Sequence, residues 1–295
     1  FHTLVPLYGL LSIPIQLTFN LVVAYNLIVL ASFVFGGLTA FLLVRYVVRD
    51  EWGAFIAGAA FTFSSYHVAR AMGHINLVLV QCLPLYALLL LKSADSRRFA
   101  VLTGACLFLV LLVDLHYLLY CTLLTGVFAF YHLWRARADR SQIVRCVSSL
   151  LIIVVSFTLL SSPVLVPMVR IATSSPDIYP DVSEVVYHSA DLVSYFIPSR
   201  YQFLYGAKFS RIRNVLSQGP FESHNFLGYT CLILGIVGGF ATWPRERREV
   251  IFWIGVVLFF WMLSLGPVLH VAGRTEFTPF KASVLLPYAF LHGLR

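Results

Sequence analysis

The sequence has little charge, and this scarcity sets the class of protein. Only 12% of its 295 residues are charged, while 59% are hydrophobic. An ordinary soluble domain carries about twice that charged fraction, so this class is excluded. The strict alternation of short segments that marks a membrane β-barrel is also missing, because the apolar runs are continuous and rich in Leu.

Several signatures of soluble enzymes and of metal sites are missing as well. The five cysteines lie singly in apolar runs, which indicates small buried hydrophobic residues and neither disulfides nor metal ligands. No Gly-rich phosphate loop, nucleophile elbow, CxxC or HExxH motif occurs. The formal charge of +8 comes largely from arginines in loops, as expected at a membrane surface, and we predict no nucleic-acid partner.

No signal peptide is visible where the sequence begins. Phe1 is followed by no basic region and no small-residue cleavage site of a signal peptide. An apolar run begins shortly before Arg295. We therefore expect a piece of a longer protein, cut at both ends, with residues 1–295 forming a single transmembrane domain.

The apolar runs are long enough to cross a bilayer, which takes about 20 helical residues for a core of about 30 Å. Residues 3–18 are interrupted by Pro6 and Pro14 and predict a short, broken or interfacial helix, and a last apolar stretch begins near 282. The expected fold class is an all-α polytopic transmembrane bundle of about eight to ten spans. The predicted spans lie near 20–44, 53–69, 75–91, 99–113, 117–134, 147–169, 226–243 and 250–266.

The stretch 99–134 predicts two helices. One helix would be about 54 Å long, and basic loops flank the stretch on both sides. Two short crossings that meet at Asp114, Leu115 and His116 agree with both facts. Because each crossing is short, we expect this turn below the bilayer surface, in a cavity lined by protein.

The basic residues fix the orientation. Four short loops carry most of them, at 45–51, 92–98, 135–146 and 244–249. These loops fall on one side of the predicted spans, which the positive-inside bias assigns to the cytoplasm. The turns at 70–74 and 114–116 and the long loop 170–225 are then extracytoplasmic, and they carry the remaining polar residues.

The first extracytoplasmic turn contains Arg70, His74 and Asn76. His67, Arg70 and His74 share one helix face if the helix continues to Gly73. Arg70 can extend to lipid head groups, or it can bind a donor phosphate with His74 and Asn76 as hydrogen-bond partners, because its planar fork suits phosphate.

The second turn places Asp114 beside His116 and Tyr117. A carboxylate in apolar membrane sequence is a functional-site hypothesis, and Asp114 and His116 are candidate catalytic residues. Asp114 can equally be the N-cap of the helix that follows, which needs no catalysis. A metal pair is the weaker interpretation, since no H-x-x-x-H or H-E-x-x-H spacing accompanies it.

The long loop holds further candidates. Its aromatic and apolar residues predict order, many of its acids can simply be solvated, and the stretch 191–197 is suited to lie along the membrane surface. Ser223 can merely cap the helix that follows. Glu222 is a candidate catalytic residue, and the candidate substrate-binding residues of the chain are Tyr117, His188, His224, Asn225 and Tyr229.

Several of these motifs resemble polytopic glycosyltransferases of the GT-C superfamily, in its bacterial branch. They are AYN at 24–26, FTFSSYH at 61–67, GHINL at 73–77, QCLPLY at 81–86, DLHY at 114–117, DLVSYFIPS at 191–199 and HNFLGY at 224–229. The resemblance implies a polyprenyl-phosphate-linked sugar donor, an extracytoplasmic lipid, glycan or protein acceptor, and a bacterial inner-membrane location. The resemblance does not decide whether a divalent cation is a cofactor.

The resemblance also implies an acidic residue in the first outer loop. No acidic residue precedes Asp50, which lies in a basic loop. We therefore expect this acid upstream of Phe1. The alternatives are a transporter or flippase for a lipid-linked or anionic substrate, and a non-catalytic membrane subunit. Transporters often have repeated halves and midplane charges. Here no repeat is visible and the polar residues gather at one edge, which favours the enzyme.

Overall fold

The computed structural model describes residues 5–137, 139–174, 182–216, 224–277 and 282–293. The fold class is all-α, as predicted, with one short two-stranded pairing. The chain forms two compact units, the first from Phe1–Phe63 and Arg70–Pro176 and the second from Ser64–Ala69 and Asp177–Arg295. The assignment of 1–295 to a single transmembrane domain stays a prediction.

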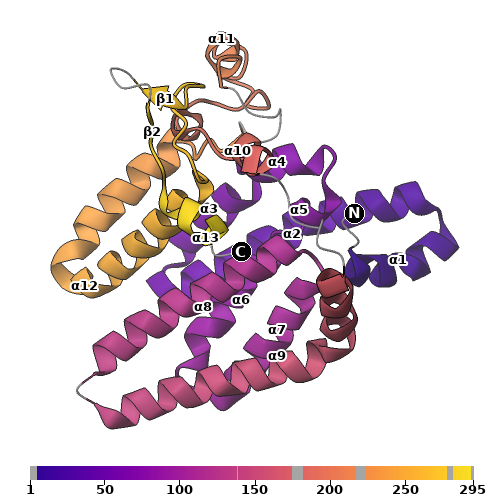
Figure 1. The fold of residues 1–295 in the computed structure, drawn as a ribbon, viewed down its shortest axis with the longest axis vertical. Coiled ribbons are helices and arrows are strands. Elements are labelled where there is room, and N and C mark those ends of the chain that lie inside the picture. Colours follow the sequence, from indigo (N-terminus) through magenta and orange to yellow (C-terminus); the bar gives the residue numbers. More distant parts are fainter. Residues whose placement is uncertain (1–4, 138, 175–181, 217–223, 278–281, 294–295) are drawn as a thin grey trace. The chain divides into compact units, whose positions relative to one another are not determined.

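The first unit is built from helices that follow one another with short turns (Figure 1). Within it, α2 packs along α3 and α6, while α7 packs between α6 and α9 and α8 packs on α9. The helices of this unit are α1 (Pro6–Thr18), α2 (Leu21–Val48), α3 (Glu51–Thr62), α5 (Ile75–Val78), α6 (Cys82–Ser93), α7 (Arg97–Leu111), α8 (Leu115–Ala136) and α9 (Arg140–Ser174). The short helix α4 (Ser65–Ala71) is divided between the units.

Two of the predicted spans are broken. The stretch 53–69 divides into α3 and α4 at Phe63 and Ser64, and the stretch 75–91 divides into α5 and α6. Pro84 explains the second break, because proline has no N–H for the helical bond and is tolerated only in the first turn. The structure accordingly begins α6 at Cys82.

Other predicted boundaries are confirmed. The stretch 99–134 forms two helices, α7 and α8, that meet at Asp114. The stretches 226–243 and 250–266 are the two arms of α12 (Tyr229–Ser264), which is interrupted by non-helical Glu246 two residues after Pro244. Figure 1 shows these arms meeting at a sharp bend.

The second unit joins α12 to the long loop. Its other elements are α10 (Val182–Tyr187), the 3-10 helix η2 (Leu192–Tyr195), α11 (Ser210–Arg213), β1 (Glu276–Phe277), β2 (Ala282–Ser283) and α13 (Pro287–Gly293). The strands pair antiparallel. Tyr195 and Ala190 pack with Leu265 at the end of α12, and Trp261 and Leu269 lie against them. The described residues of the long loop include α10, η2 and α11.

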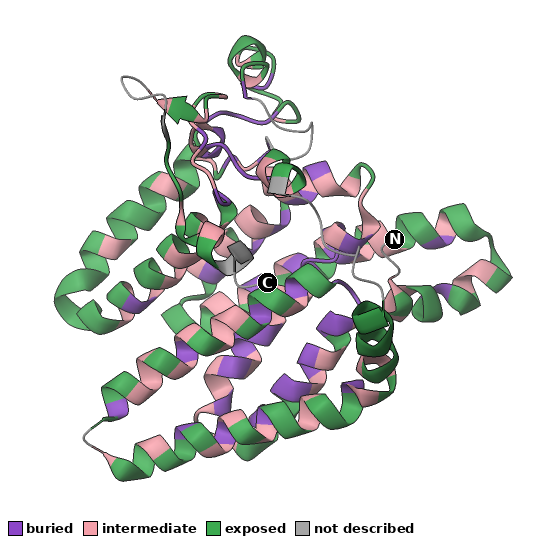
Figure 2. Ribbon diagram, viewed as in Figure 1, coloured by how far each residue is buried: buried purple, intermediate pink, exposed green. Residues whose placement is uncertain are grey.

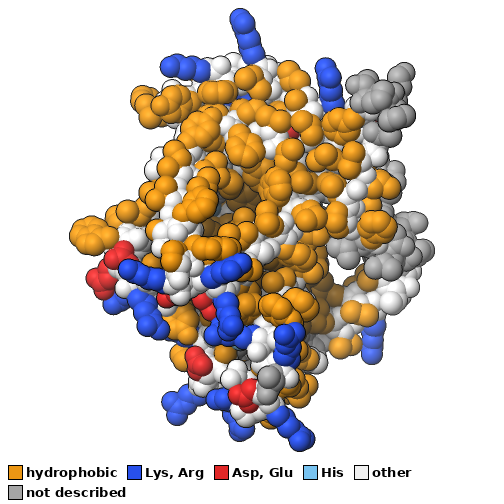
Figure 3. All heavy atoms as spheres, turned by 90° about the vertical axis from the view of Figure 1, so that its left-hand side faces the viewer, with side chains coloured by type: hydrophobic (Ala, Val, Ile, Leu, Met, Phe, Trp, Pro, Cys, Tyr) orange, Lys and Arg blue, Asp and Glu red, His pale blue; other side chains and the backbone are white. Residues whose placement is uncertain are grey.

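Three described helices, α2, α8 and α9, are long and apolar enough to cross a membrane. The chain is therefore a multi-pass membrane protein. Figure 2 shows that exposed residues occur along these helices. Among the large apolar side chains exposed are Leu30, Leu151 and Leu159. Figure 3 shows many exposed hydrophobic side chains on the elements in view, as expected of helices that face lipid. The number of about eight to ten spans stays a prediction.

Glycines bring α2 and α3 into close contact, as small residues do between membrane helices. A Cβ on Gly58 would lie 2.8 Å from the carbonyl oxygen of Gly37. Neither backbone can yield without separating the helices. By contrast, nothing lies within 4 Å of a Cβ added to Gly126 in α8.

We expect Gly58→Ala to lower the stability of the first unit by about 1–3 kcal/mol through overpacking. Gly126→Ala is the matched control and should be neutral or stabilising by up to about 1 kcal/mol, since alanine favours the helix. Thermal unfolding in detergent compares the two. Equal melting temperatures would contradict the α2–α3 contact.

Candidate functional site

The carboxylate of Asp114 joins two turns of the first unit. Asp114 is the N-cap of α8, where its side chain accepts a hydrogen bond from the His116 backbone N–H at 2.7 Å. This confirms the capping interpretation. The residue does more than cap, however, because Asn76 donates from Nδ2 to its other oxygen at 2.7 Å. Asn76, which was predicted to bind the phosphate of the sugar donor, is therefore hydrogen-bonded to the candidate catalytic residue Asp114.

His116 completes this arrangement, which we call the Asp114 cluster (Asn76, Asp114 and His116). Its ring Nδ1 lies 2.9 Å from Asp114 Oδ1. The Asp114 side chain is 3% exposed, whereas that of His116 is 67% exposed. A carboxylate that engages Nδ1 fixes the orientation of the imidazole and leaves Nε2 as the other proton-exchanging nitrogen. The pair can therefore present a base at the surface of the unit.

The surroundings of Asp114 keep it ionised. Burial raises the pKa of this carboxyl. The hydrogen bonds from His116 and Asn76, together with the charge of His116, lower the pKa by more than burial raises it, so the net pKa lies below its ordinary value. Hydrogen bonds to the charged form stabilise that form. Asp114 is thus buried in its ionised form and not as a neutral carboxylic acid.

Tyr117 ties the same two turns together through the backbone. Its hydroxyl donates to the carbonyl of Leu77, and the residue is 2% exposed. Tyr117 was predicted to bind substrate, but its hydroxyl is already committed to a structural bond. Asp114 and Tyr117 are buried, whereas Leu115 is 52% exposed, so the placement of the turn at 114–116 in a protein-lined cavity below the bilayer surface stays a prediction.

Arg70 and His74 lie in the turn that leads to Asn76. The helix α4 ends at Ala71 and does not continue to Gly73, so the condition for a common helix face of His67, Arg70 and His74 is not met. Instead the chain turns at Gly73, and the N–H of His74 donates to the carbonyl of Arg70 at 2.9 Å. Both side chains are partly buried. Arg70 and His74 therefore precede Asn76 in a turn and are not spaced along one continuous helix.

The second unit pairs two of the singled-out segments, 191–199 and 224–229. Ser199 Oγ lies 2.8 Å from His224 Nδ1, and both residues are 1% exposed. Asn225 donates to Ser194 Oγ at 3.2 Å, and the Tyr229 hydroxyl donates to the carbonyl of Phe196 at 2.9 Å. Three predicted substrate-binding residues therefore meet in one cluster, and His224 is buried among protein groups.

Asp191 organises this segment, which sequence reasoning left among the acids that can be solvated. It is 1% exposed. Its carboxylate accepts backbone N–H bonds from Val193, Ala272 and Gly273 at 2.8, 3.1 and 2.7 Å. Ala272 and Gly273 have φ of 50° and 77°, and successive amides in such turns form a concave anion-binding site. An Asp directly before an apolar stretch is the cap signal that could have identified it.

The same packing corrects the prediction that 191–197 lies along the membrane surface. Tyr195 and Ile197 are buried in the unit, and the Tyr195 hydroxyl lies 2.5 Å from Ser264 Oγ. His270 follows in this core, where burial lowers the pKa of its imidazole, although the charge of Asp191 and a bond to Val268 act in the opposite direction. The stretch therefore packs against protein.

The remaining candidates are separate. His188 is exposed at the end of α10, with its ring edge-on to Tyr187. Glu222 lies outside the described residues. Within the described ranges no group of three or more His, Cys, Asp or Glu residues could hold a metal ion. Arg70, His74 and the Asp114 cluster belong to the first unit, whereas His188, His224 and Asn225 belong to the second, so their convergence on one pocket stays a prediction.

Comparison with known proteins gives a family without an assigned activity. The model of the family described as Domain of unknown function (DUF6311) matches residues 4–288, and the chain belongs to that family. No curated protein matches the chain. No solved structure matches it either.

The Asp114 cluster predicts a specific response to pH. The depressed pKa means that the ionised carboxylate contributes stability above its ordinary pKa of 3.8, and that this contribution is lost as the pH falls through the lower folded value. Asn76→Ala should cost about 1.5–3 kcal/mol near neutral pH, the value of a hydrogen bond to a charged group. The substitution should also make the loss of stability on acidification smaller, because the pKa of Asp114 in the folded state then moves toward its value in the unfolded state.

Thermal unfolding in detergent, from neutral pH to below the ordinary Asp pKa, measures both effects. Asn26→Ala is the control, because Asn26 is an exposed asparagine of the same unit. If both variants unfold with the same pH profile, Asn76 does not hold the carboxylate.

Proposed function

We propose that this DUF6311 member is a membrane glycosyltransferase that moves a sugar from a polyprenyl-phosphate donor to a lipid, glycan or protein acceptor on the extracytoplasmic face. The observation that carries the proposal is the Asp114 cluster. A buried, ionised carboxylate orients an exposed histidine at the end of two apolar helices. Ionisable groups in such a position are costly and typically functional.

The chemistry of glycosyl transfer fits this arrangement. The acceptor hydroxyl attacks the anomeric carbon, the bond from that carbon to the phosphate oxygen breaks, and a base takes the hydroxyl proton. His116 is the base in this scheme because its side chain is 67% exposed, and Asp114 stabilises the imidazolium that results. The exposed side of His116 is where an acceptor can approach.

The departing phosphate needs positive charge and hydrogen-bond donors. Arg70 and His74 supply these from the turn that leads to Asn76. The guanidinium of Arg70 can bind two phosphate oxygens at once, and His74 adds a further donor. A membrane-embedded enzyme suits such a donor, since its polyprenyl tail stays in lipid while the phosphate reaches this turn.

The proposal also assigns an orientation in the bacterial inner membrane. The four basic loops are cytoplasmic, and the turns at 70–74 and 114–116 and the loop 170–225 are extracytoplasmic. Arg137 lies in a basic loop and Leu204 in the long loop, and both are exposed.

Labelling of introduced cysteines in a cysteine-free background tests this orientation. A membrane-impermeant maleimide should label Leu204→Cys in intact spheroplasts but should reach Arg137→Cys only after lysis. Reaction of both positions in intact spheroplasts would contradict the separation of the two faces, and the opposite pattern would invert it.

Donor binding tests the role of Arg70 in the full-length protein. Arg70→Gln should raise the KM for a polyprenyl-phosphate sugar at least about tenfold, the loss expected for charge-assisted bonds to phosphate, whereas His116→Gln should lower kcat with little change in that KM. Transfer of radiolabelled sugar in membranes measures both. Arg49→Gln, in a cytoplasmic loop, is the control.

Unchanged turnover of Arg70→Gln at limiting donor would remove Arg70 from the site. Movement of the labelled lipid between leaflets without transfer of its sugar would instead favour a transporter or flippase. The two assays on one membrane preparation therefore separate these functions.

A further inference from the structure

A second polar site lies in the first unit, where α6 and α8 end and α9 begins. It is a cavity of about 260 Å³. Its floor is formed by buried residues, namely Phe128, Ala136, Cys146 and Ser149. Ser149 donates to the carbonyl of Ser93 at 2.9 Å, so the floor is fixed by a bond between α9 and the end of α6. The rim, in contrast, is polar.

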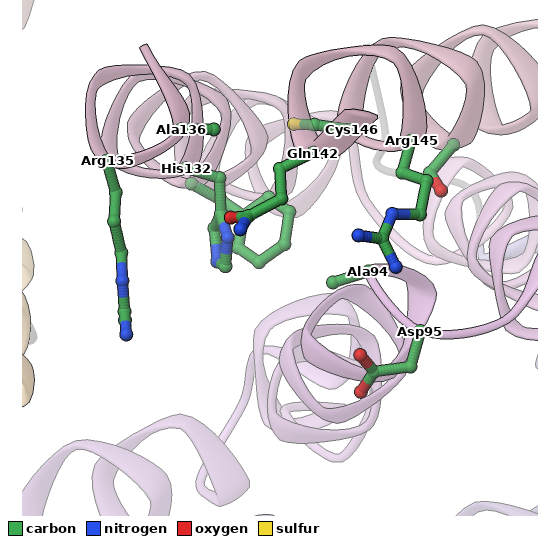
Figure 4. Close-up of a pocket in the computed structure, with 10 residues that line it drawn as sticks. Ala94, Asp95, His132, Arg135, Ala136, Gln142, Arg145 and Cys146 are labelled. Atoms are coloured by element: carbon green, nitrogen blue, oxygen red, sulfur yellow. The ribbon is translucent and has the colours of Figure 1, made fainter. Parts of the chain in front are cut away.

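The rim carries positive charge from two helices. Arg135 comes from α8 and Arg145 from α9, and both are exposed, with His132 half-buried beside them. In Figure 4, His132 and Gln142 lie between the side chains of the two arginines. Cationic side chains from two helices therefore line the cavity.

Two acidic residues lie near this rim, and neither pairs with Arg145. Asp95 is exposed at one edge of the cavity (Figure 4), and Asp139 accepts bonds from Ser141 and Gln142 at the start of α9. Within the described ranges, Arg145 has no carboxylate at ion-pair distance. The loops 92–98 and 135–146 together hold seven basic and two acidic residues, so their field is strongly positive.

The aromatic residues indicate that this end of the unit meets lipid head groups. Trp134 is 59% exposed on α8, and the guanidinium of Arg137 lies 5.7 Å from its ring centroid. Lys92, at the end of α6, lies 5.2 Å from the ring centroid of Phe99. Exposed tryptophan beside basic residues, at the end of an apolar span, is typical of the membrane interface.

We propose that this cavity binds the phosphate of an anionic phospholipid headgroup from the cytoplasmic leaflet. The planar forks of Arg135 and Arg145 would each bind phosphate oxygens. Asp95 at the edge would accept a hydrogen bond from a headgroup hydroxyl. Basic pockets between membrane helices on the cytoplasmic side recognise anionic head groups in this way.

The position of the cavity favours a lipid over a soluble phosphate ester. It opens where two candidate spans, α8 and α9, reach their ends. A lipid at this interface would place its phosphate at the rim while its acyl chains stay in the bilayer, whereas a soluble ester would use the rim alone. The proposal is independent of glycosyl transfer, because none of these residues belongs to the Asp114 cluster.

Thermal stability of the purified protein in mixed micelles tests the site. Added dioleoylphosphatidylglycerol should raise the melting temperature in a saturable way, because a ligand that binds the folded state stabilises it, and dioleoylphosphatidylcholine should not. Arg145→Gln should raise the half-saturating amount of the anionic lipid about tenfold, the loss expected for a charge-assisted bond. Arg135→Gln should act in the same direction.

Arg97→Gln is the matched control. It makes the same change of charge at Arg97, an exposed arginine at the start of α7 that does not line the cavity, and should keep the wild-type midpoint. Melting temperatures without added lipid establish that each variant folds. Equal midpoints for Arg97→Gln and both cavity variants would overturn the site. Stabilisation by free sn-glycerol 3-phosphate at the same concentrations as the phospholipid would overturn the assignment to a lipid.

Discussion

A carboxylate buried in an apolar helical unit must find its hydrogen-bond donors within the protein, since leaving it unpaired costs several kcal/mol. Asp114 finds three donors, the side chain of Asn76 and the backbone and ring of His116. The donors come from two turns that lie far apart in the sequence. The requirement to satisfy one charge therefore holds the polar end of the first unit in a single arrangement, and the exposed position of His116 depends on it.

The second unit solves the same problem with backbone donors. Asp191 is bound by amides of its own segment and of residues 272–273. The positive φ at Ala272 and Gly273 directs those amides to one point. Because these donors are backbone amides, and Asp191 orients no histidine through them, we regard it as a structural anchor. The contrast with Asp114, which orients an exposed histidine, is the reason for proposing chemistry at Asp114 alone.

The polar residues of the first unit serve two different requirements at its two ends. At one end a few groups are fixed by specific bonds around Asp114. At the other end many basic groups surround a cavity, and their side chains are exposed. The first arrangement suits a reaction that needs precise proton transfer, whereas the second suits attraction of an anionic surface and retention of one phosphate. Both follow from helices that end at the edges of an apolar layer.

The sequence by itself determined the class of fold, because long apolar runs with few charges can only be helices that satisfy their own backbone in lipid. It also determined the helix break at Asp114 and gave the cap as one interpretation of that residue, because both are local properties of a polar residue between two apolar runs. The breaks near Phe63 and Leu79 were missed, although Pro84 marked the second. Only the tertiary structure decided that Asn76 binds Asp114, that Asp191 is buried against residues 272–273, and that two basic loops enclose a cavity. These contacts join segments that are distant in the chain, and residue spacing carries no information about which distant turns will meet when the helices pack.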